Sequence, residues 1–218
     1  MSHPQLEQLI TTLETLRAPG GCAWDREQTH GSLVRYLLEE TYELVDAIEA
    51  GDDEGLKEEL GDVLYQVVFH SDIAAEQGRF TLEDVAANMT AKMVSRHPHV
   101  FGDSPQLGSG DEVAARWDDL KKADKPERTS VLDGVPQAMP SLLLADKLLG
   151  KAEKLDVTVA PPGEGASTGE WADEDALGDQ LLSIVAAAKD QGMDAERALR
   201  GALRRLQDDL RSAESARS

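Results

Sequence analysis

Acidic residues at helical spacing are the feature of this sequence with the most evident chemistry. Glu40 and Glu43 are three residues apart, and so are Glu59 and Asp62. Residues at positions i and i+3 lie on one side of an α-helix, so each pair presents two carboxylates together. Four converging carboxylates at neutral pH require a cation, and all-oxygen ligands favour Mg²⁺ or Mn²⁺. The spacing therefore favours a divalent metal site.

The two pairs flank a predicted turn, GDDEG, at residues 51–55. Counted from Asp52, the first pair lies nine and twelve residues back and the second lies seven and ten residues forward. At a rise of about 1.5 Å per residue, the pairs are roughly 13–18 Å and 10–15 Å from the turn. A helical hairpin would bring them together at similar heights. Its predicted apolar stripes are Leu37, Thr41, Leu44, Val45 and Ile48, then Leu56, Leu60, Val63, Leu64, Val67 and Val68.

Gly61 lies inside the second helix, between two of these acidic residues. Glycine there costs about 1 kcal/mol relative to alanine, and close approach of another backbone would compensate. We therefore expect tight helix packing at the metal. The alternative is that the acidic residues form a solvated helix face, because fifteen acidic and two basic residues lie between positions 39 and 84. A di-iron bundle is disfavoured because Glu40 is followed three residues on by Glu43, and Glu59 by Asp62, where that type of site needs histidine.

The elements that must position these residues are predicted to be helices. Leu, Ala, Glu and Asp dominate the 218 residues while aromatic residues make up 4%, which indicates an all-α fold. Helical periodicity ends near Arg17 and resumes at residues 32–50, from the cap at 52 or 53 to Gly78, and from Thr81 to Pro98. Further helices are predicted at about 111–125, 141–155, 174–191 and 194–213.

The overall charge excludes several classes of partner. There are 42 acidic and 22 basic residues, giving a net charge of −20, which disfavours stable binding to nucleic acid or to anionic membranes. Cys22 is the single cysteine, so no internal disulfide can form. The first residues lack a basic start and a long apolar run, and no stretch reaches 18 consecutive apolar residues. We expect a cytoplasmic protein.

Several segments together resemble the MazG family of nucleoside triphosphate pyrophosphohydrolases, within the all-α NTP pyrophosphatase superfamily. They are EETYE and EELGD in the predicted hairpin, then GCAWDREQTH, RHPHVFGD, ARWDDLKK and LDGVPQAMPSLLLADKL around it, in the family's order over roughly residues 5–155. The chain departs from the pattern at Ala23, where proline is usual. The resemblance implies an all-α helical bundle and a dimeric assembly of helical hairpins, hence a homodimer or higher homo-oligomer.

The resemblance also implies an activity, hydrolysis of NTP or dNTP to the monophosphate and pyrophosphate with Mg²⁺, for which Mn²⁺ substitutes. It implies broad specificity that clears the nucleotide pool. The residues carried over as catalytic are Glu39, Glu40, Glu43, Glu59 and Asp62. Four of them are the metal ligands Glu40, Glu43, Glu59 and Asp62, and Glu39 is an outer ligand or a water-orienting base. The resemblance further implies that Lys92 and Arg96 hold the polyphosphate and that Trp117 contacts substrate.

A second, weaker copy of the hairpin pattern follows the first. LGDQLLSIVAAAKDQG from Leu177 echoes LGDVLYQVVFHSDIAAEQG from Leu60, but Ala176 replaces Glu59 and no EExxE element precedes it. We therefore predict a MazG-like catalytic helical domain at residues 1–125. Residues 126–218 are predicted to be a linker helix plus a degenerate second MazG-like unit.

Two other functions stay open at this point. A narrower dUTP or dCTP pyrophosphatase would use the same carboxylates, so the sequence does not distinguish its substrate. A non-catalytic helical interaction module would use the acidic hairpin as a docking surface. Metal-dependent turnover separates the enzymes from the module.

Overall fold

The computed structural model describes residues 3–102, 108–110, 112–113, 116, 120, 129–157 and 171–215. Every regular element within those ranges is helical, which confirms the all-α prediction. The elements are α1 (Pro4–Arg17), α2 (Ala23–Glu27), α3 (His30–Ala50), α4 (Asp53–Glu76), α5 (Leu82–Arg96), α6 (Pro98–Phe101), α8 (Ser141–Ala152), the 3₁₀ turn η1 (Glu153–Leu155), α9 (Glu174–Asp190) and α10 (Ala195–Ser215). The chain divides into two compact units, residues 1–124 and 125–218.

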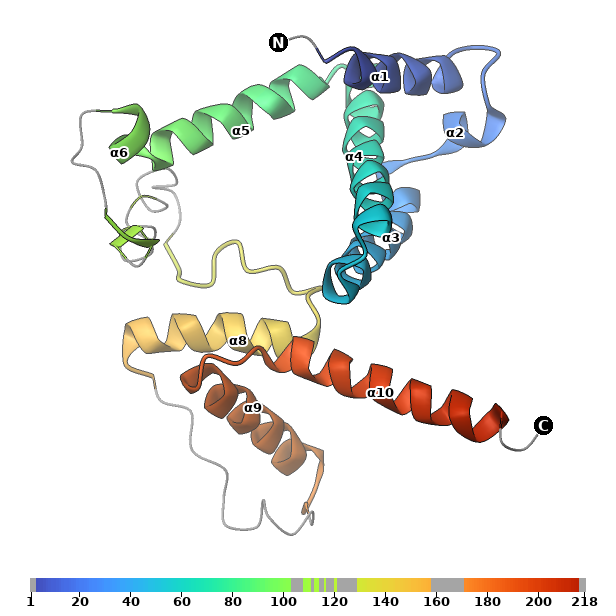
Figure 1. Cartoon of the computed structure of the whole chain (residues 1–218). Coiled ribbons are helices and arrows are strands. Elements are labelled where there is room, and N and C mark those ends of the chain that lie inside the picture. Colours follow the sequence, from blue (N-terminus) through green and yellow to red (C-terminus); the bar gives the residue numbers. More distant parts are fainter. Residues whose placement is uncertain are drawn as a thin grey trace. The chain divides into compact units, whose positions relative to one another are not determined.

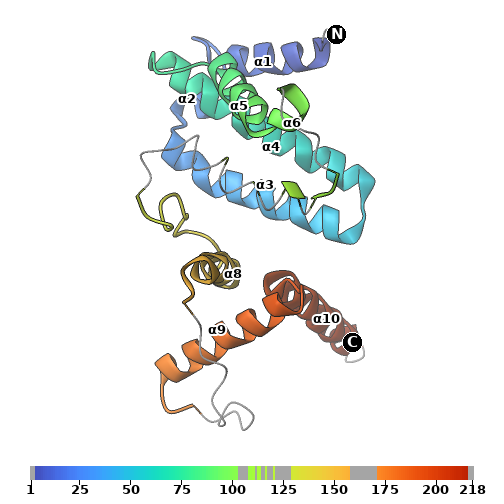
Figure 2. The same cartoon turned by 90° about the vertical axis from the view of Figure 1, so that its left-hand side faces the viewer.

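The first unit is built on a long hairpin of α3 and α4, which run side by side in both views (Figures 1 and 2). Local sequence signals define its turn. Gly51 ends α3 with φ of 68°, a left-handed conformation that glycine adopts at little cost. Asp52 then caps α4, its Oδ1 accepting hydrogen bonds from the backbone N–H groups of Glu54 and Gly55. The predicted hairpin is confirmed.

The core of this unit lies at the end of the hairpin away from the turn. Five side chains are almost fully buried there, with α1 packed against α4: Leu13, Leu33, Val68, Phe69 and Ile73. Arg17, 5% exposed, fastens α1 to α4 by donating to Asp72 at 2.5 Å and to Glu76 at 2.6 Å. Its guanidinium also donates to the backbone carbonyl of Asp25, which holds α2 in place.

Part of the apolar stripe predicted to close the hairpin is exposed instead. Ile48 is 56% exposed, Leu60 51% and Val67 40%, whereas Leu33 and Ala47 are buried although they lie outside the predicted stripe. Two antiparallel helices can cover only the sides that face each other or the helices packed on them. The hairpin therefore keeps an apolar surface open to solvent within one chain.

Helix α5 follows the end of α4 that lies in this core and extends away from the hairpin (Figure 1). Thr81 caps its start. The Thr81 side-chain oxygen accepts a hydrogen bond from the backbone N–H of Asp84, and the Asp84 carboxylate accepts one from the backbone N–H of Thr81. This reciprocal cap matches the predicted start. At the other end Pro98 opens the short helix α6, as the predicted stop requires.

The second unit contains α8, α9 and α10, with contacts among all three. Leu149 of α8 and Val185 of α9 are buried, and Lys189 of α9 donates to Asp146 of α8 at 3.4 Å. The helices predicted at 174–191 and 194–213 are present within two residues at each end, and the one predicted at 141–155 is α8 followed by the 3₁₀ turn η1. Most of the helix predicted at 111–125 lies outside the described residues. No helix in the described ranges is long and apolar enough to cross a lipid bilayer.

Candidate metal centre

Three carboxylates meet on the α3–α4 hairpin. Glu40 and Glu43 come from α3 and Glu59 comes from α4, and one oxygen of each lies within 4.8 Å of the others. Within the part of the chain that the structure describes, these residues form the one group of acidic, histidine or cysteine side chains close enough to share a metal ion. The predicted convergence across the turn is therefore present for these three.

Asp62 and Glu39 lie beside this group. Asp62 is half-buried on α4, one turn after Glu59. Of the neighbouring charges that raise the pKa of Glu40, that of Asp62 has the largest effect. Glu39 is exposed on α3, and its charge has a smaller effect in the same direction. All five predicted catalytic carboxylates thus lie on one stretch of the hairpin.

The electrostatics of the group favour a cation. Desolvation by burial raises the pKa of Glu40, and the charges of Asp62, Glu43 and Glu59 raise it further. The pKa of Glu59 is also raised, again by desolvation first and then by Glu43 and Asp62. Because each carboxylate disfavours ionisation of the next, a bound positive charge would remove the repulsion.

The donor set fits a hard divalent ion. It consists of carboxylate oxygens, the ligands that Mg²⁺ and Mn²⁺ prefer, and includes no thiolate or imidazole. Glu43 is exposed while Glu40 and Glu59 are half-buried, so the group opens to solvent. An open site leaves room for water and for substrate phosphates, which Mg²⁺ usually keeps among its ligands.

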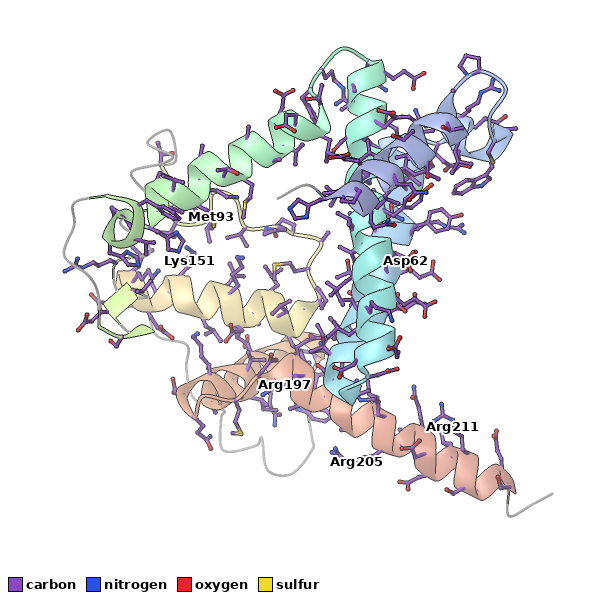
Figure 3. All side chains as sticks on the ribbon, turned by 45° about the horizontal axis from the view of Figure 1, so that its top comes forward. Asp62, Met93, Lys151, Arg197, Arg205 and Arg211 are labelled. Atoms are coloured by element: carbon purple, nitrogen blue, oxygen red, sulfur yellow. The ribbon has the colours of Figure 1, made fainter. Side chains whose placement is uncertain are left out.

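The predicted phosphate-binding residues lie elsewhere on the chain. Lys92 and Arg96 are on α5, where Lys92 is half-buried and Arg96 is buried. Figure 3 shows Met93, the residue after Lys92, near the far end of α5 and well separated from Asp62 on α4. Within one chain the structure does not bring Lys92 to the carboxylates. The predicted substrate contact Trp117 lies outside the described residues.

The expectation of tight backbone packing at Gly61 is wrong for a single chain. Gly61 is exposed, and a Cβ placed on it would meet no atom of the described residues within 4 Å, apart from its chain neighbours and its own helix backbone. The apolar residues around it, including Leu60 and Leu64, are also exposed. Among the described residues, no neighbouring backbone compensates for the helical cost of this glycine.

A buried acid next to the hairpin was missed by the pattern analysis. Asp25, on the five-residue helix α2, is 8% exposed and accepts a hydrogen bond from the hydroxyl of Tyr65 on α4. Burial, and then the charge of Asp25, raises the pKa of Tyr65 to about 12. So short a helix shows no periodicity, and the position of Asp25 in the segment GCAWD was the one available signal.

Comparison with known proteins places this arrangement in a family. Residues 28–101, which contain α3, α4 and α5, match the model of the MazG nucleotide pyrophosphohydrolase domain. A nucleoside triphosphate pyrophosphohydrolase/pyrophosphatase MazG of Thermotoga maritima is 40% identical over 223 residues, covering 95% of this chain and 85% of that protein. The chain belongs to the MazG family.

Other relatives match over a similar extent. The nucleoside triphosphate pyrophosphohydrolase of Escherichia coli K12 is 36% identical over 230 residues, 96% of this chain and 87% of that protein. An uncharacterized 26.1 kDa protein of Streptomyces cacaoi is 43% identical over 212 residues, with 96% and 83% covered. These matches extend over both units, whereas the MazG domain match contains the five carboxylates together with Lys92 and Arg96.

Proposed function

We propose that this protein hydrolyses nucleoside triphosphates to the monophosphate and pyrophosphate in a reaction that depends on Mg²⁺, with Mn²⁺ as a substitute. The observation that carries the proposal is the meeting of Glu40, Glu43 and Glu59 within 4.8 Å, inside the segment that matches the MazG domain. The pyrophosphohydrolase names of the Thermotoga and Escherichia relatives support the same reaction. Broad specificity across bases is part of the proposal.

Each carboxylate has a proposed role. Glu40, Glu43, Glu59 and Asp62 would hold the ion, and Glu39, exposed beside them, would act as an outer ligand or orient the attacking water. When bound, the ion supplies charge stabilisation on the phosphates and acidifies a coordinated water. This chemistry needs no nucleophilic side chain, because the attacking group is water. The ionised carboxylates of this chain therefore provide both the binding site and the acceptor for the proton of water.

Binding of the polyphosphate is assigned to Lys92 and Arg96, and Trp117 is proposed to contact the rest of the substrate. Because α5 carries Lys92 away from the carboxylates of its own chain, we propose that the site is completed in a homodimer or a higher homo-oligomer. The exposed apolar residues of the hairpin support such an assembly, since one chain leaves them uncovered. They include Val34, Leu38, Tyr42, Leu60, Leu64 and Val67.

The two compact units are proposed to differ in activity. Residues 1–125 would form the catalytic unit, and residues 126–218 the linker helix and a degenerate second unit. Ala176 lies in the first turn of α9, at the position that corresponds to Glu59, and offers no carboxylate. A second metal site of the same kind is not expected there.

The test is product analysis after incubation of the full chain with ATP, dUTP and the other common triphosphates. With Mg²⁺ we expect nucleoside monophosphate and pyrophosphate from several substrates, and no turnover after EDTA. Release of orthophosphate and a diphosphate, or undiminished activity in EDTA, would overturn the proposal. Turnover of dUTP or dCTP alone would overturn the broad specificity while leaving the reaction intact.

A further inference from the structure

Helix α10 presents a row of leucines to solvent. Leu199 and Leu203 are each 49% exposed, Leu206 is 53% exposed and Leu210 is 57% exposed. Their spacing of four, three and four residues places them on one side of the helix. This is the spacing of the a and d positions that form the seam of a coiled coil.

The leucine row does not serve the packing of α10 within its own unit. The half-buried residues of α10 are Ala195, Glu196, Arg200, Gly201, Ala202 and Arg204. They all belong to the first half of the helix, and α10 contacts both α8 and α9. From Arg205 to Ser215 every residue is exposed, and the helix extends beyond its neighbours (Figures 1 and 2). Four half-exposed leucines on one helix form an apolar stripe that calls for a partner.

The leucine spacing is symmetric about the middle of the helix. The midpoint between Leu199 and Leu210 falls between Arg204 and Arg205, and so does the midpoint between Leu203 and Leu206. When two such helices run antiparallel, Leu199 of one faces Leu210 of the other, and Leu203 faces Leu206. Both layers are then filled by leucine from each copy, as an isologous interface requires.

The charges on α10 are complementary under the same arrangement. Residues 195–205 contain four arginines and one glutamate, whereas residues 206–215 contain three acidic residues and one arginine. Arg197, Arg205 and Arg211 mark the length of the helix in Figure 3. An antiparallel pair places the arginine-rich half of each helix beside the acidic half of the other and opposes the helix dipoles. A parallel pair would place the arginine-rich halves together.

We propose that α10 pairs with α10 of a second copy of this chain as an antiparallel two-stranded coiled coil. At about 1.5 Å per residue, its 21 residues span roughly 31 Å, or three heptads. The occupant is a second copy because the leucine layers and the charge halves are self-complementary. The leucine row belongs to the second unit and includes none of the proposed catalytic residues, so the pairing does not depend on the proposed hydrolysis.

The test is site-directed disulfide cross-linking in the full chain. Cys22→Ser removes the single natural cysteine, and Leu199→Cys or Leu210→Cys is then added, one to each of two variants. Co-produced and oxidised together, the two variants should give a covalent dimer that contains one copy of each. Each variant produced alone should remain uncross-linked, because identical positions lie at opposite ends of an antiparallel pair.

Cross-linking of each variant with itself would indicate a parallel pair and overturn the proposal. No cross-link in any mixture would mean that something other than α10 of a second copy covers the leucines, including another part of the same chain, and would also overturn it.

A second measurement uses no cysteine variants, so it still tests the proposal if those variants misfold. Leu203→Gln with Leu206→Gln keeps good helix formers on α10 but removes the central apolar layers. Sedimentation velocity should show self-association weakened by tenfold or more, with unchanged helical content in circular dichroism. The matched control, Leu132→Gln with Leu155→Gln, alters two leucines that are 53% and 57% exposed outside α10, and should leave association unchanged. Equal self-association of the wild type, the Leu203 and Leu206 variant and the control variant would overturn the proposal.

Discussion

Glu43 and Glu59 meet across the α3–α4 hairpin, with carboxylate oxygens within 4.8 Å of each other although they are sixteen positions apart along the chain. Two like charges this close raise the cost of ionising either one, and the pKa of Glu59 is raised accordingly, by desolvation first and then by Glu43. A divalent ion would turn that repulsion into attraction. Removing the charge of one member of this pair is therefore a direct test of the proposed metal site.

Glu59→Gln keeps the size of the side chain but removes its charge. We expect metal affinity to fall and turnover to drop by about a hundredfold or more, since a bound ion contributes several kcal/mol and each tenfold corresponds to about 1.4 kcal/mol. Titration with Mn²⁺ and steady-state kinetics measure both effects. Glu58→Gln is the matched control, because Glu58 is exposed and lies about 100° around the helix. Equal damage by the two changes would show that acidic density, rather than geometry, carries the effect.

Lys92→Ala should act on substrate rather than on metal. Loss of one charged hydrogen bond to phosphate is worth about 1.5–3 kcal/mol, so we expect KM to rise roughly tenfold to a hundredfold with Mn²⁺ affinity unchanged. A parallel loss of metal affinity would place Lys92 with the carboxylates and contradict its position on α5.

The separation of Lys92 from Asp62 within one chain also predicts complementation between copies. In a twofold dimer whose sites combine the hairpin of one copy with α5 of the other, a mixed pair of Glu59→Gln and Lys92→Ala contains one intact site. Random mixing should then restore about a quarter of the wild-type activity. The measurement is turnover after the two variants are refolded together, with each variant refolded alone for comparison. Activity no higher than the average of the separate variants would mean that both residues act within one chain.

Arg17→Ala should destabilise the first unit. The buried guanidinium donates to Asp72 and Glu76 and lies 5.2 Å from the centre of the Phe69 ring, so its removal leaves Asp72 without this partner. We expect the free energy of unfolding to fall by about 2–3 kcal/mol, less than for a fully buried pair because Glu76 is mostly exposed. Urea unfolding measures the loss. Arg26→Ala, an exposed arginine on α2, should change stability by no more than about 0.5 kcal/mol.

His70 should make the first unit sensitive to mild acid. Its Nδ1 lies 2.7 Å from Nδ1 of His30, the two rings are stacked, and Arg79 contacts the other nitrogen of His30. Burial, and then His30, lowers the pKa of His70 below its ordinary 6.5. The unfolded chain therefore takes up a proton first, so the stability present above pH 6.5 is lost as the pH falls through the lowered pKa.

His70→Gln removes this titration, and its melting temperature should decline less than that of the wild type between about pH 7.5 and pH 5.5. Thermal unfolding followed by circular dichroism at several pH values measures the decline. His3→Gln, at an exposed histidine before α1, should reproduce the wild-type curve. A wild-type decline that persists in His70→Gln would assign the acid sensitivity to other groups.

The sequence by itself determined where the helices lie along the chain and how far the carboxylates are from the hairpin turn. Gly51, Asp52, Thr81 and Pro98 act on their immediate neighbours, so caps and stops read from the sequence match the structure closely. Helical rise and period are constant, and for that reason the meeting of Glu40 and Glu43 with Glu59 followed from counting residues across the turn.

Tertiary structure alone decided which apolar residues are buried and where α5 goes. Leu60 and Val67 fit a helical apolar stripe yet are exposed, because burial depends on which other helices pack on a given side. The direction of α5 depends on how it packs at the end of α4, a contact between residues that no local pattern encodes, so the separation of Met93 from Asp62 was visible only in the structure. The short helix α2, which packs against α1, and the hydrogen bond from Tyr65 to Asp25 likewise depend on packing between separate helices. Local sequence determines where helices begin and end, whereas packing between distant segments determines which helix surfaces are buried.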